Sequence, residues 1–329
     1  MTNICSERFL DPFASPFVLS TVCHVITFFE FPLHISGGYC ILVKTPKKME
    51  KVKMSMMIMH ISIVFMNFIE SFLVIPFAMV PVMAGTALGW LNKIRVPLEL
   101  QLCSVITGPA VAGISILAVY ENRYSVLCDN FIWKRIRVPY LIFNYLSAFS
   151  CFIYPAIQIP EQTSARNVVL EKYPCIFQKS QIDINSIIVL GFNPIAVAGP
   201  LLAQIVFNYA QGLVFLFLTY NYFSTKALKL SPSTYQMQKK FMIALLMQSL
   251  IFTIFLGGPV SAITLTMFAD SYDQGFNNLS IIALSMNASI STIAMIYFHP
   301  SYRQWTAEAF RKLFKKPNTI VAPSVVSVI

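Results

Sequence analysis

Seven long apolar stretches divide this chain. They cover roughly residues 17–43, 54–80, 98–121, 138–158, 198–223, 241–267 and 278–298. Each stretch can supply the roughly 20 helical residues that cross the hydrocarbon core of a bilayer, which is about 30 Å thick. Because lipid offers the backbone no hydrogen-bond partners, we expect helices and not open strands. The sequence therefore predicts an all-α bundle of seven transmembrane helices, spanning residues 1–303.

The composition agrees with a membrane protein. Hydrophobic residues make up 56% of the 329 residues and charged residues 12%, whereas soluble domains carry about 25% charged residues. No stretch rich in Gly, Ser or charge separates two halves, which favours a single bundle. The halves also do not match each other, which argues against the transporters that are built from inverted repeats.

The basic residues indicate how the bundle is oriented. With the N-terminus outside, 18 of the 24 Lys and Arg residues fall on the cytoplasmic side, which is where basic residues of short loops accumulate. These 18 are Lys44, Lys47, Lys48, Lys51, Lys53, Arg123, Lys134, Arg135, Arg137, Lys226, Lys229, Lys239, Lys240, Arg303, Arg311, Lys312, Lys315 and Lys316. The protein has a net charge of +10, which in this orientation lies mostly on the cytoplasmic side and is attracted to anionic lipid. Binding of nucleic acid is disfavoured, because the charge is spread over loops and not concentrated on one face.

Five of the polar residues within the apolar stretches are candidates for function, because such side chains are costly in a bilayer. They are Glu30, His34, His60, Asn67 and Glu70. His60 and Asn67 are seven residues apart and share one helix face, and Glu70 follows about one turn later. Glu30 and His34 are four apart and can pair. A polar stripe of this kind faces the bundle interior and lines a ligand cavity, holds an ion, or joins helices by hydrogen bonds.

The sixth stretch and the C-terminal region carry three further features. Gly257, Gly258 and Pro259 form a candidate hinge, because proline removes a backbone hydrogen bond. Residues 304–316 alternate apolar and basic side chains at helical spacing, which predicts an amphipathic helix on the inner membrane surface. Residues 317–329 are expected to be a disordered tail, whose last three residues could bind a PDZ domain as an added strand.

Cysteine and histidine placement limits the chemistry. An oxidising exterior permits one disulfide, in which Cys175 pairs with Cys5 or with Cys103, and the sequence does not choose between these partners. The four histidines have no metal-ligand spacing, and no phosphate loop or nucleophile elbow is present. We therefore expect no enzyme activity, no metal and no cofactor.

Glu121, Asn122, Arg123 and Tyr124 lie at the cytoplasmic end of the third stretch. An acid and an arginine at this position could hold the bundle closed and later release the arginine to a partner. Glu121 and Arg123 are only two residues apart, however, so they do not face each other on a helix. Each must therefore find its partner on another helix.

The chain resembles the nematode serpentine chemoreceptors of class H. The block Gly38-Tyr-Cys-Ile-Leu-Val-Lys-Thr-Pro-Lys-Lys-Met-Glu-Lys-Val-Lys53 is the most specific part of the resemblance. Supporting positions are Ser15-Pro16, His24, Pro32, His60, Glu121 to Tyr124, Ser291-Thr292, His299 and Tyr302-Arg303, so residues 12 to 303 are covered. The chain departs from the family pattern at Asn67, where an acidic residue is usual, at Asn287-Ala288, and at Pro300-Ser301.

The resemblance implies a G-protein-coupled chemoreceptor in sensory cilia, which binds a small odorant or other environmental ligand from outside and a heterotrimeric G protein inside. Arg123 with Glu121 and Tyr124 would then act at the partner end, followed by Lys239 and Lys240. The alternative is a seven-span ligand-gated channel or transporter. Insect-type odorant channels place the N-terminus inside, so an N-terminal epitope that is readable on intact cells would favour the receptor.

Overall fold

The computed structural model describes residues 11–128, 130–172, 182–226, 232–269 and 272–314. Its helices are α1 (Pro16–Lys44), α2 (Glu50–Phe68), α3 (Trp90–Lys93), α4 (Leu98–Leu127), α5 (Phe131–Ser150), α6 (Ile153–Ile157), α7 (Gln162–Lys172), α9 (Pro194–Lys226), α10 (Pro232–Phe268), α11 (Gln274–Ser285), α12 (Asn287–Phe298) and α13 (Pro300–Phe314). Short turns of other helix types occupy Asp11–Ala14, Lys47–Met49, Ile69–Leu73 and Ile184–Ser186. The strands are β1 (Pro76–Met79), β2 (Ala84–Ala87) and β3 (Ile188–Val189).

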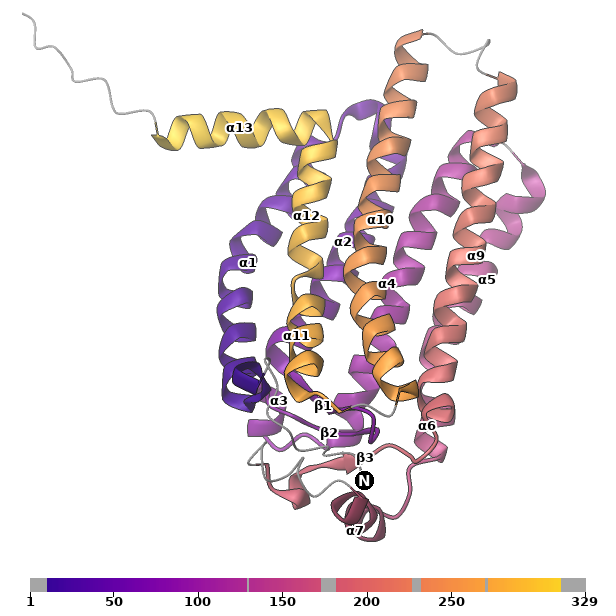
Figure 1. Ribbon diagram of the computed structural model, residues 1–329. Coiled ribbons are helices and arrows are strands. Elements are labelled where there is room, and N and C mark those ends of the chain that lie inside the picture. The colour runs from indigo at the N-terminus through magenta and orange to yellow at the C-terminus, as the bar shows by residue number, and fades with distance from the viewer. Residues whose placement is uncertain (1–10, 129, 173–181, 227–231, 270–271, 315–329) are drawn as a thin grey trace, which may run out of the picture.

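The fold is the predicted seven-helix bundle. Within the described ranges, seven helical segments are long and apolar enough to cross a membrane: 16–44, 50–73, 98–127, 131–157, 194–225, 238–268 and 274–298. Figure 1 shows them side by side, with the three strands at one end and α13 lying crosswise at the other. We call these the sheet end and the α13 end.

Helix α4 is the centre of the bundle. It packs against α2, α5 and α9, and its side chains Ile114, Leu117 and Val119 are almost fully buried. Helix α10 packs instead against α11 and α12 and makes few contacts with α9. The bundle is therefore close-packed around α4 and α12 but loosely packed between α9 and α10.

The second apolar stretch is the main difference from the sequence-based expectation. It was predicted to be helical over 54–80, but helix ends at Leu73 and the chain turns into strand β1 at Pro76. Pro76 disfavours helical backbone at the preceding residue, and Ile75 indeed adopts a φ of 47°. The polypeptide then returns as β2, and β3 adds to β2 to complete an antiparallel sheet.

The sheet closes its end of the bundle. Phe77 and Met79 of β1 and Val189 of β3 are fully buried. Gln162 of α7 holds β3 through two hydrogen bonds with the backbone of Val189, at 3.1 and 2.9 Å. Gln274 of α11 donates to the carbonyl of Ala78 in β1 at 3.1 Å. Two of the connections between spans, one with β1 and β2 and the other with α7 and β3, are thus fastened over the helix ends.

Other helix boundaries also differ from the predicted ones. Helix α5 begins at Phe131 rather than near 138, because Asn130 caps it by accepting hydrogen bonds from the backbone N–H groups of Ile132 and Trp133. The seventh span consists of two helices that meet at Met286. Helix α13 begins at Pro300, four residues before the predicted start. The predicted tail, 317–329, lies outside the described residues.

Candidate functional sites

Arg123 is buried at the α13 end of α4, with 2% of its surface exposed. Its guanidinium carbon lies 3.6 Å from the ring centroid of Phe241 on α10, which is a cation–π contact. Among the described residues, its Nε and Nη2 atoms have no hydrogen-bond partner. The arginine is therefore held mainly by an aromatic face, which leaves its N–H donors available to another acceptor.

Glu121 is fully buried and points to α5 instead. Its carboxylate accepts hydrogen bonds from Arg137 Nη2 at 3.0 Å and from Trp133 Nε1 at 2.8 Å. Arg137 also donates to Asn122 Oδ1 at 3.0 Å. As the two-residue spacing requires, Glu121 and Arg123 have partners on different helices.

The neighbouring Tyr124 faces α5 and α9. Its ring centroid lies 6.1 Å from that of Trp133 and 5.9 Å from that of Phe215. At the end of α4, Glu121 thus contacts α5, Tyr124 contacts α5 and α9, and Arg123 contacts α10. A shift of α10 alone therefore changes the surroundings of Arg123 more than those of Glu121 or Tyr124.

A cavity of about 360 Å³ opens at the α13 end beside this cluster. Its lining residues are Pro46, Met49, Gln236, Lys240, Phe241, His299, Pro300, Ser301 and Tyr302. Lys240 is therefore at the cavity, whereas Lys239 is exposed and does not line it. Phe241 lines this cavity and also contacts Arg123.

His299 and Tyr302 extend the aromatic cluster at the junction of α12 and α13. The ring of His299 lies 5.4 Å from that of Phe241 and 4.9 Å from that of Tyr302. Burial, with a smaller contribution from the Arg123 guanidinium, lowers the pKa of His299 from 6.5 to about 4. Burial also raises the pKa of Tyr302 to about 12, against a hydrogen bond with Thr45 that lowers it.

The lowered pKa of His299 predicts a stability that depends on pH. The folded protein keeps this ring neutral, so the stabilisation is complete above pH 6.5 and is lost as the pH falls toward 4. Between pH 7 and pH 5 this amounts to about 2 kcal/mol. Thermal melting of the purified protein should follow this profile, and His299→Phe, which keeps a packed ring, should flatten it. Parallel profiles for the two proteins would contradict the assignment.

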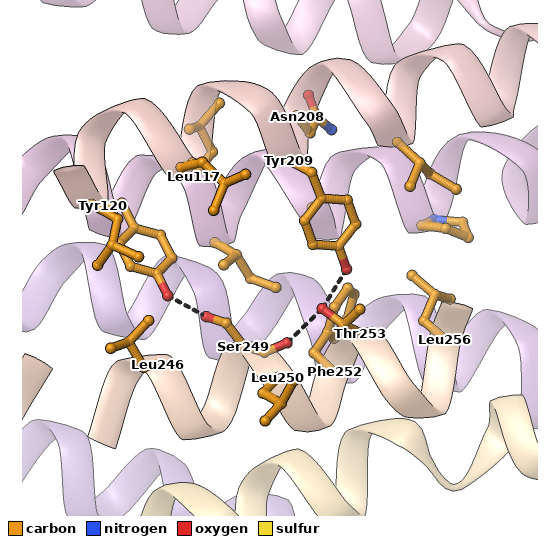
Figure 2. A pocket seen from close by; sticks show the side chains of 17 residues that line it. Leu117, Tyr120, Asn208, Tyr209, Leu246, Ser249, Leu250, Phe252, Thr253 and Leu256 are labelled. Carbon is orange, nitrogen blue, oxygen red and sulfur yellow. Dashed lines mark hydrogen bonds between the residues drawn. The ribbon is translucent and has the colours of Figure 1, made fainter. Parts of the chain in front are cut away.

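A second cavity lies in the middle of the bundle, between α4, α9 and α10, and has a volume of about 250 Å³ (Figure 2). Its walls are mostly apolar and include Leu117, Leu246 and Leu256. Leu213 and Leu250, which also line it, are 63% and 51% exposed, so the cavity opens sideways onto the outer surface of the bundle. It occupies the gap between α9 and α10.

Hydroxyl groups connect the three helices along this cavity (Figure 2). Tyr120 of α4 donates to Ser249 Oγ of α10 at 3.0 Å. One turn farther along α10, Thr253 bonds to the backbone of Ser249 and shares a short hydrogen bond with Tyr209 of α9. The cavity can therefore bind an apolar molecule that carries one or two hydrogen-bonding groups.

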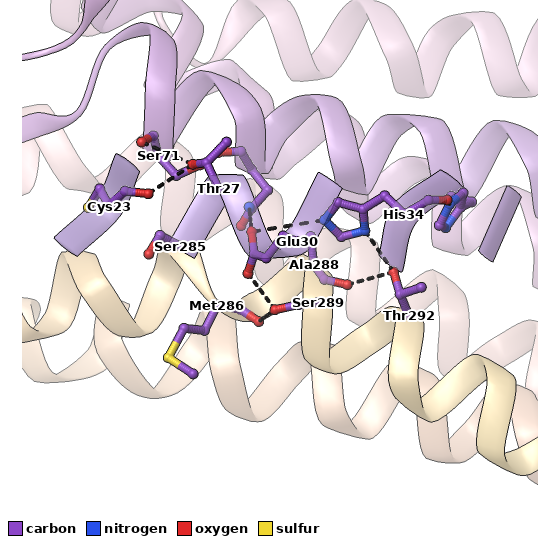
Figure 3. A network of polar contacts seen from close by, with 12 residues as sticks. Cys23, Thr27, Glu30, His34, Ser71, Ser285, Met286, Ala288, Ser289 and Thr292 are labelled. Atoms are coloured by element: carbon purple, nitrogen blue, oxygen red, sulfur yellow. Dashed lines mark hydrogen bonds and ion pairs between the residues drawn. The ribbon is translucent and has the colours of Figure 1, made fainter. Parts of the chain in front are cut away.

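The predicted intramembrane polar residues gather between α1, α2 and α12. Asn67 donates to Glu30 Oε2 at 2.8 Å, and His60 Nε2 bonds to the carbonyl of His34 at 3.1 Å. Figure 3 shows Glu30 and His34 of α1 pointing toward Ser289 and Thr292 of α12, to which they bond. The two are also near each other, with His34 Nε2 3.9 Å from Glu30 Oε2.

Glu70 is not part of this network in the contacts described. It is 4% exposed, and its Oε2 has no hydrogen-bond partner among the described residues. The sequence correctly predicted that Glu70 is a buried polar residue. Helix spacing did not show which residue Glu70 contacts.

Three other predicted features remain predictions. Helix α10 runs through Gly257, Gly258 and Pro259 without interruption, and a side chain at Gly258 would meet nothing within 4 Å. Cys103 is a free thiol among the described residues, and its proposed bridge to Cys175 stays a prediction. Cys5, Cys175 and the terminal PDZ-type residues lie outside the described part of the chain. Within that part, no group of His, Cys, Asp or Glu side chains is arranged to hold a metal ion.

The functional residues that sequence reasoning missed come from other helices. Phe241, Trp133 and Arg137 complete the environments of Arg123 and Glu121, and Tyr209 with Thr253 connects α9 to α10. Aromatic and hydroxyl side chains of this kind are frequent in membrane helices, and their pairing depends on tertiary contacts alone.

Comparison with known proteins agrees with this geometry. A family model described as "Serpentine type 7TM GPCR chemoreceptor Srh" matches residues 14–312. Serpentine receptor class H-72 of Caenorhabditis elegans is 24% identical over 314 residues, which cover 93% of this chain and 89% of that protein. The crystal structure of squid rhodopsin aligns with a TM-score of 0.55 and 11% identity, covering 96% of this chain and 91% of the rhodopsin chain, which is a likeness of fold alone. Because the family model spans most of its length, the protein belongs to the serpentine class H family of seven-transmembrane chemoreceptors and is an integral, multi-pass membrane protein.

Proposed function

We propose that this receptor binds a small, mostly apolar environmental ligand between α4, α9 and α10 and activates a heterotrimeric G protein at its α13 end. The observation that carries the proposal is that one pair of helices serves both places. Tyr120 and Ser249 join α4 to α10 at the mid-bundle cavity, and Arg123 and Phe241 join the same helices at the α13 end. Tyr120 is three residues from Arg123, and Ser249 is eight residues, about two turns, from Phe241.

This arrangement gives the ligand a way to act on the partner. A ligand that binds better when α9 and α10 are apart favours that arrangement, since only differential affinity can shift an equilibrium. A movement of α10 would withdraw Phe241 from Arg123. The arginine would then be exposed to the cavity that Lys240 lines. A G protein that binds the exposed arginine favours the same arrangement, so the two binding events support each other.

The basic residues support the orientation that this proposal needs. Lys44, Lys51, Arg137 and Arg303 all belong to segments at the α13 end, together with most of the other basic residues. Short segments rich in Lys and Arg stay in the cytoplasm. The sheet end would therefore face the exterior, as expected of a receptor at the plasma membrane of a sensory cilium, and opposite to the orientation of an insect-type odorant channel.

The ligand site can be tested by filling the mid-bundle cavity. A Cβ at Gly212, which lines this cavity, would meet nothing within 4 Å, so Gly212→Leu should fold and occupy ligand space. In cells with a promiscuous G-protein reporter, we expect the first agonist found in a screen of volatiles to lose at least tenfold in potency. The matched control is Gly199→Leu, also on α9, where a Cβ meets only Ile195 at 3.6 Å. Equal potency in both variants, at equal surface levels, would exclude this cavity.

A further inference from the structure

A lateral groove between α1 and α2 is not used by the proposed signalling mechanism. It has a volume of about 630 Å³. Its walls include Phe31, Ile35, Ile61 and Phe65, which are between 57% and 63% exposed, so in a bilayer they face lipid. A groove with such walls suits a hydrocarbon chain that enters from the membrane.

The floor of this groove, unlike its walls, is polar. Glu30, His60 and Asn67 line it and are 6%, 6% and 2% exposed, and His34 lies among them. Polar groups at this depth are costly unless they have partners. Two acceptor atoms on the floor have no hydrogen-bond partner among the described residues: Asn67 Oδ1 and His34 Nε2.

The hydrogen bonds of His34 determine what its free nitrogen can accept. Thr292 Oγ1 lies 2.8 Å from the carbonyl of Ala288 and 3.1 Å from His34 Nδ1, and a hydroxyl that donates to the carbonyl accepts from His34 Nδ1. In the neutral ring Nε2 is then an acceptor, and it faces Glu30 Oε2 at 3.9 Å, which is beyond hydrogen-bond distance. Two acceptors that face each other in this way need a donor between them.

The charge on the floor is negative. Both Glu30 oxygens accept hydrogen bonds, Oε2 from Asn67 and Oε1 from Ser289, as a carboxylate does. Among the described residues, the salt-bridge contact of Glu30 is with His34 and with no Lys or Arg. A cationic group with several N–H donors would therefore satisfy the carboxylate, His34 Nε2 and Asn67 Oδ1 together.

We propose that the groove between α1 and α2 binds a long-chain primary amine from the bilayer, with its ammonium group on Glu30, His34 and Asn67 and its hydrocarbon chain along α1 and α2. The ammonium supplies three N–H donors and the opposite charge, and the chain covers apolar walls that already face lipid. An alcohol of the same length fits the walls but supplies one donor and no charge. The amine should therefore bind in preference to the alcohol.

The test is a binding assay on the full receptor in nanodiscs of phosphatidylcholine, with tritium-labelled hexadecylamine as the probe. We expect saturable binding, with hexadecanol at least tenfold weaker as a competitor. Glu30→Gln, which keeps the shape but removes the charge, should weaken amine binding at least tenfold and leave hexadecanol unchanged. Equal competition by amine and alcohol would show that the charge of the head group is not recognised, and would overturn the proposal.

A second variant tests the groove without touching its floor. A Cβ at Gly38 would come no closer than 3.9 Å to His60, so Gly38→Leu should fold and fill the groove. It should weaken amine binding at least tenfold, whereas Gly199→Leu on α9 should not. Binding that is unaffected by Gly38→Leu would overturn the proposal, as would displacement of the amine by NaCl alone as effectively as by unlabelled amine.

Discussion

Replacing Arg123 with alanine is expected to abolish ligand-driven G-protein activation while delivery of the receptor to the cell surface stays intact. The guanidinium contacts Phe241 at 3.6 Å and has two N–H positions without a hydrogen bond among the described residues. Alanine removes the cation–π contact but also removes a buried charge whose donors are only partly used, and these two effects on the folded state oppose each other. The activated state loses the side chain that would contact the G protein.

Typical magnitudes favour Arg123 over Glu121 as the group that would change its contacts on activation. A desolvated cation–π contact is worth about 2 kcal/mol. Coupling between two sites in a receptor is typically 1–3 kcal/mol, so a ligand can supply what separates Arg123 from Phe241. Breaking a buried salt bridge costs about 3–5 kcal/mol, which is more than such a ligand provides. The pair of Glu121 and Arg137 is therefore expected to persist in both states.

The measurement is agonist-stimulated G-protein activation at matched surface expression. Arg135→Ala is the control, because Arg135 is an exposed arginine at the same end of the bundle. Phe241→Ala should have the opposite effect to Arg123→Ala and raise basal activity, since it removes the aromatic face that holds the guanidinium. Wild-type signalling by Arg123→Ala would remove the proposed role, whatever Phe241→Ala does.

Much of the fold could be predicted because it depends on local physical chemistry. Apolar length alone gave the seven spans, and helix spacing correctly separated Glu121 from Arg123. The seven-residue interval between His60 and Asn67 placed both on the face of α2 that contacts α1. These inferences need only the bilayer thickness and the helical repeat.

The hairpin of β1 and β2 could not be predicted in the same way. Residues 76–80 are as apolar as a transmembrane helix, so hydropathy extended the second span to residue 80 and did not show the turn into β1. Pro76 and Pro81 were the available signals for the end of the helix. Prolines are also common inside membrane helices, however, so these two did not mark the boundary. What decides the outcome is pairing with Ile188 and Val189, about 100 residues away, which no local pattern contains.

The site residues also divide into those that local sequence signals identified and those that depend on tertiary contacts. Arg123 stood out in the sequence because a charged residue at a helix end is conspicuous, but Phe241 is one of 28 phenylalanines. The mid-bundle cavity depends on the weak packing of α9 against α10, and packing between two particular helices follows from the complete fold. Sequence reasoning therefore identified Arg123 and Glu121 but missed the side chains on other helices that contact them.

Glu121→Ala is expected to destabilise the receptor strongly. It leaves Arg137 Nη2 and Trp133 Nε1 without the carboxylate that accepts from them at 3.0 and 2.8 Å. Removing one partner of a buried ion pair costs about 3–5 kcal/mol, and the lower end applies because the Arg137 side chain is 28% exposed. The melting temperature of the purified protein should fall accordingly, and Glu121→Gln, which still accepts from Trp133, should lose less.

A double-mutant cycle with Arg137→Ala separates the ion pair from other effects of the substitution. If Glu121 and Arg137 act together, the double variant should be more stable than the sum of the two single losses predicts, by about 1 kcal/mol or more. Basal signalling should stay near the wild-type level in the variants that reach the surface. A Glu121→Ala receptor that melts like the wild type but signals without ligand would assign the switch to Glu121 and α5, and would remove it from Arg123 and α10.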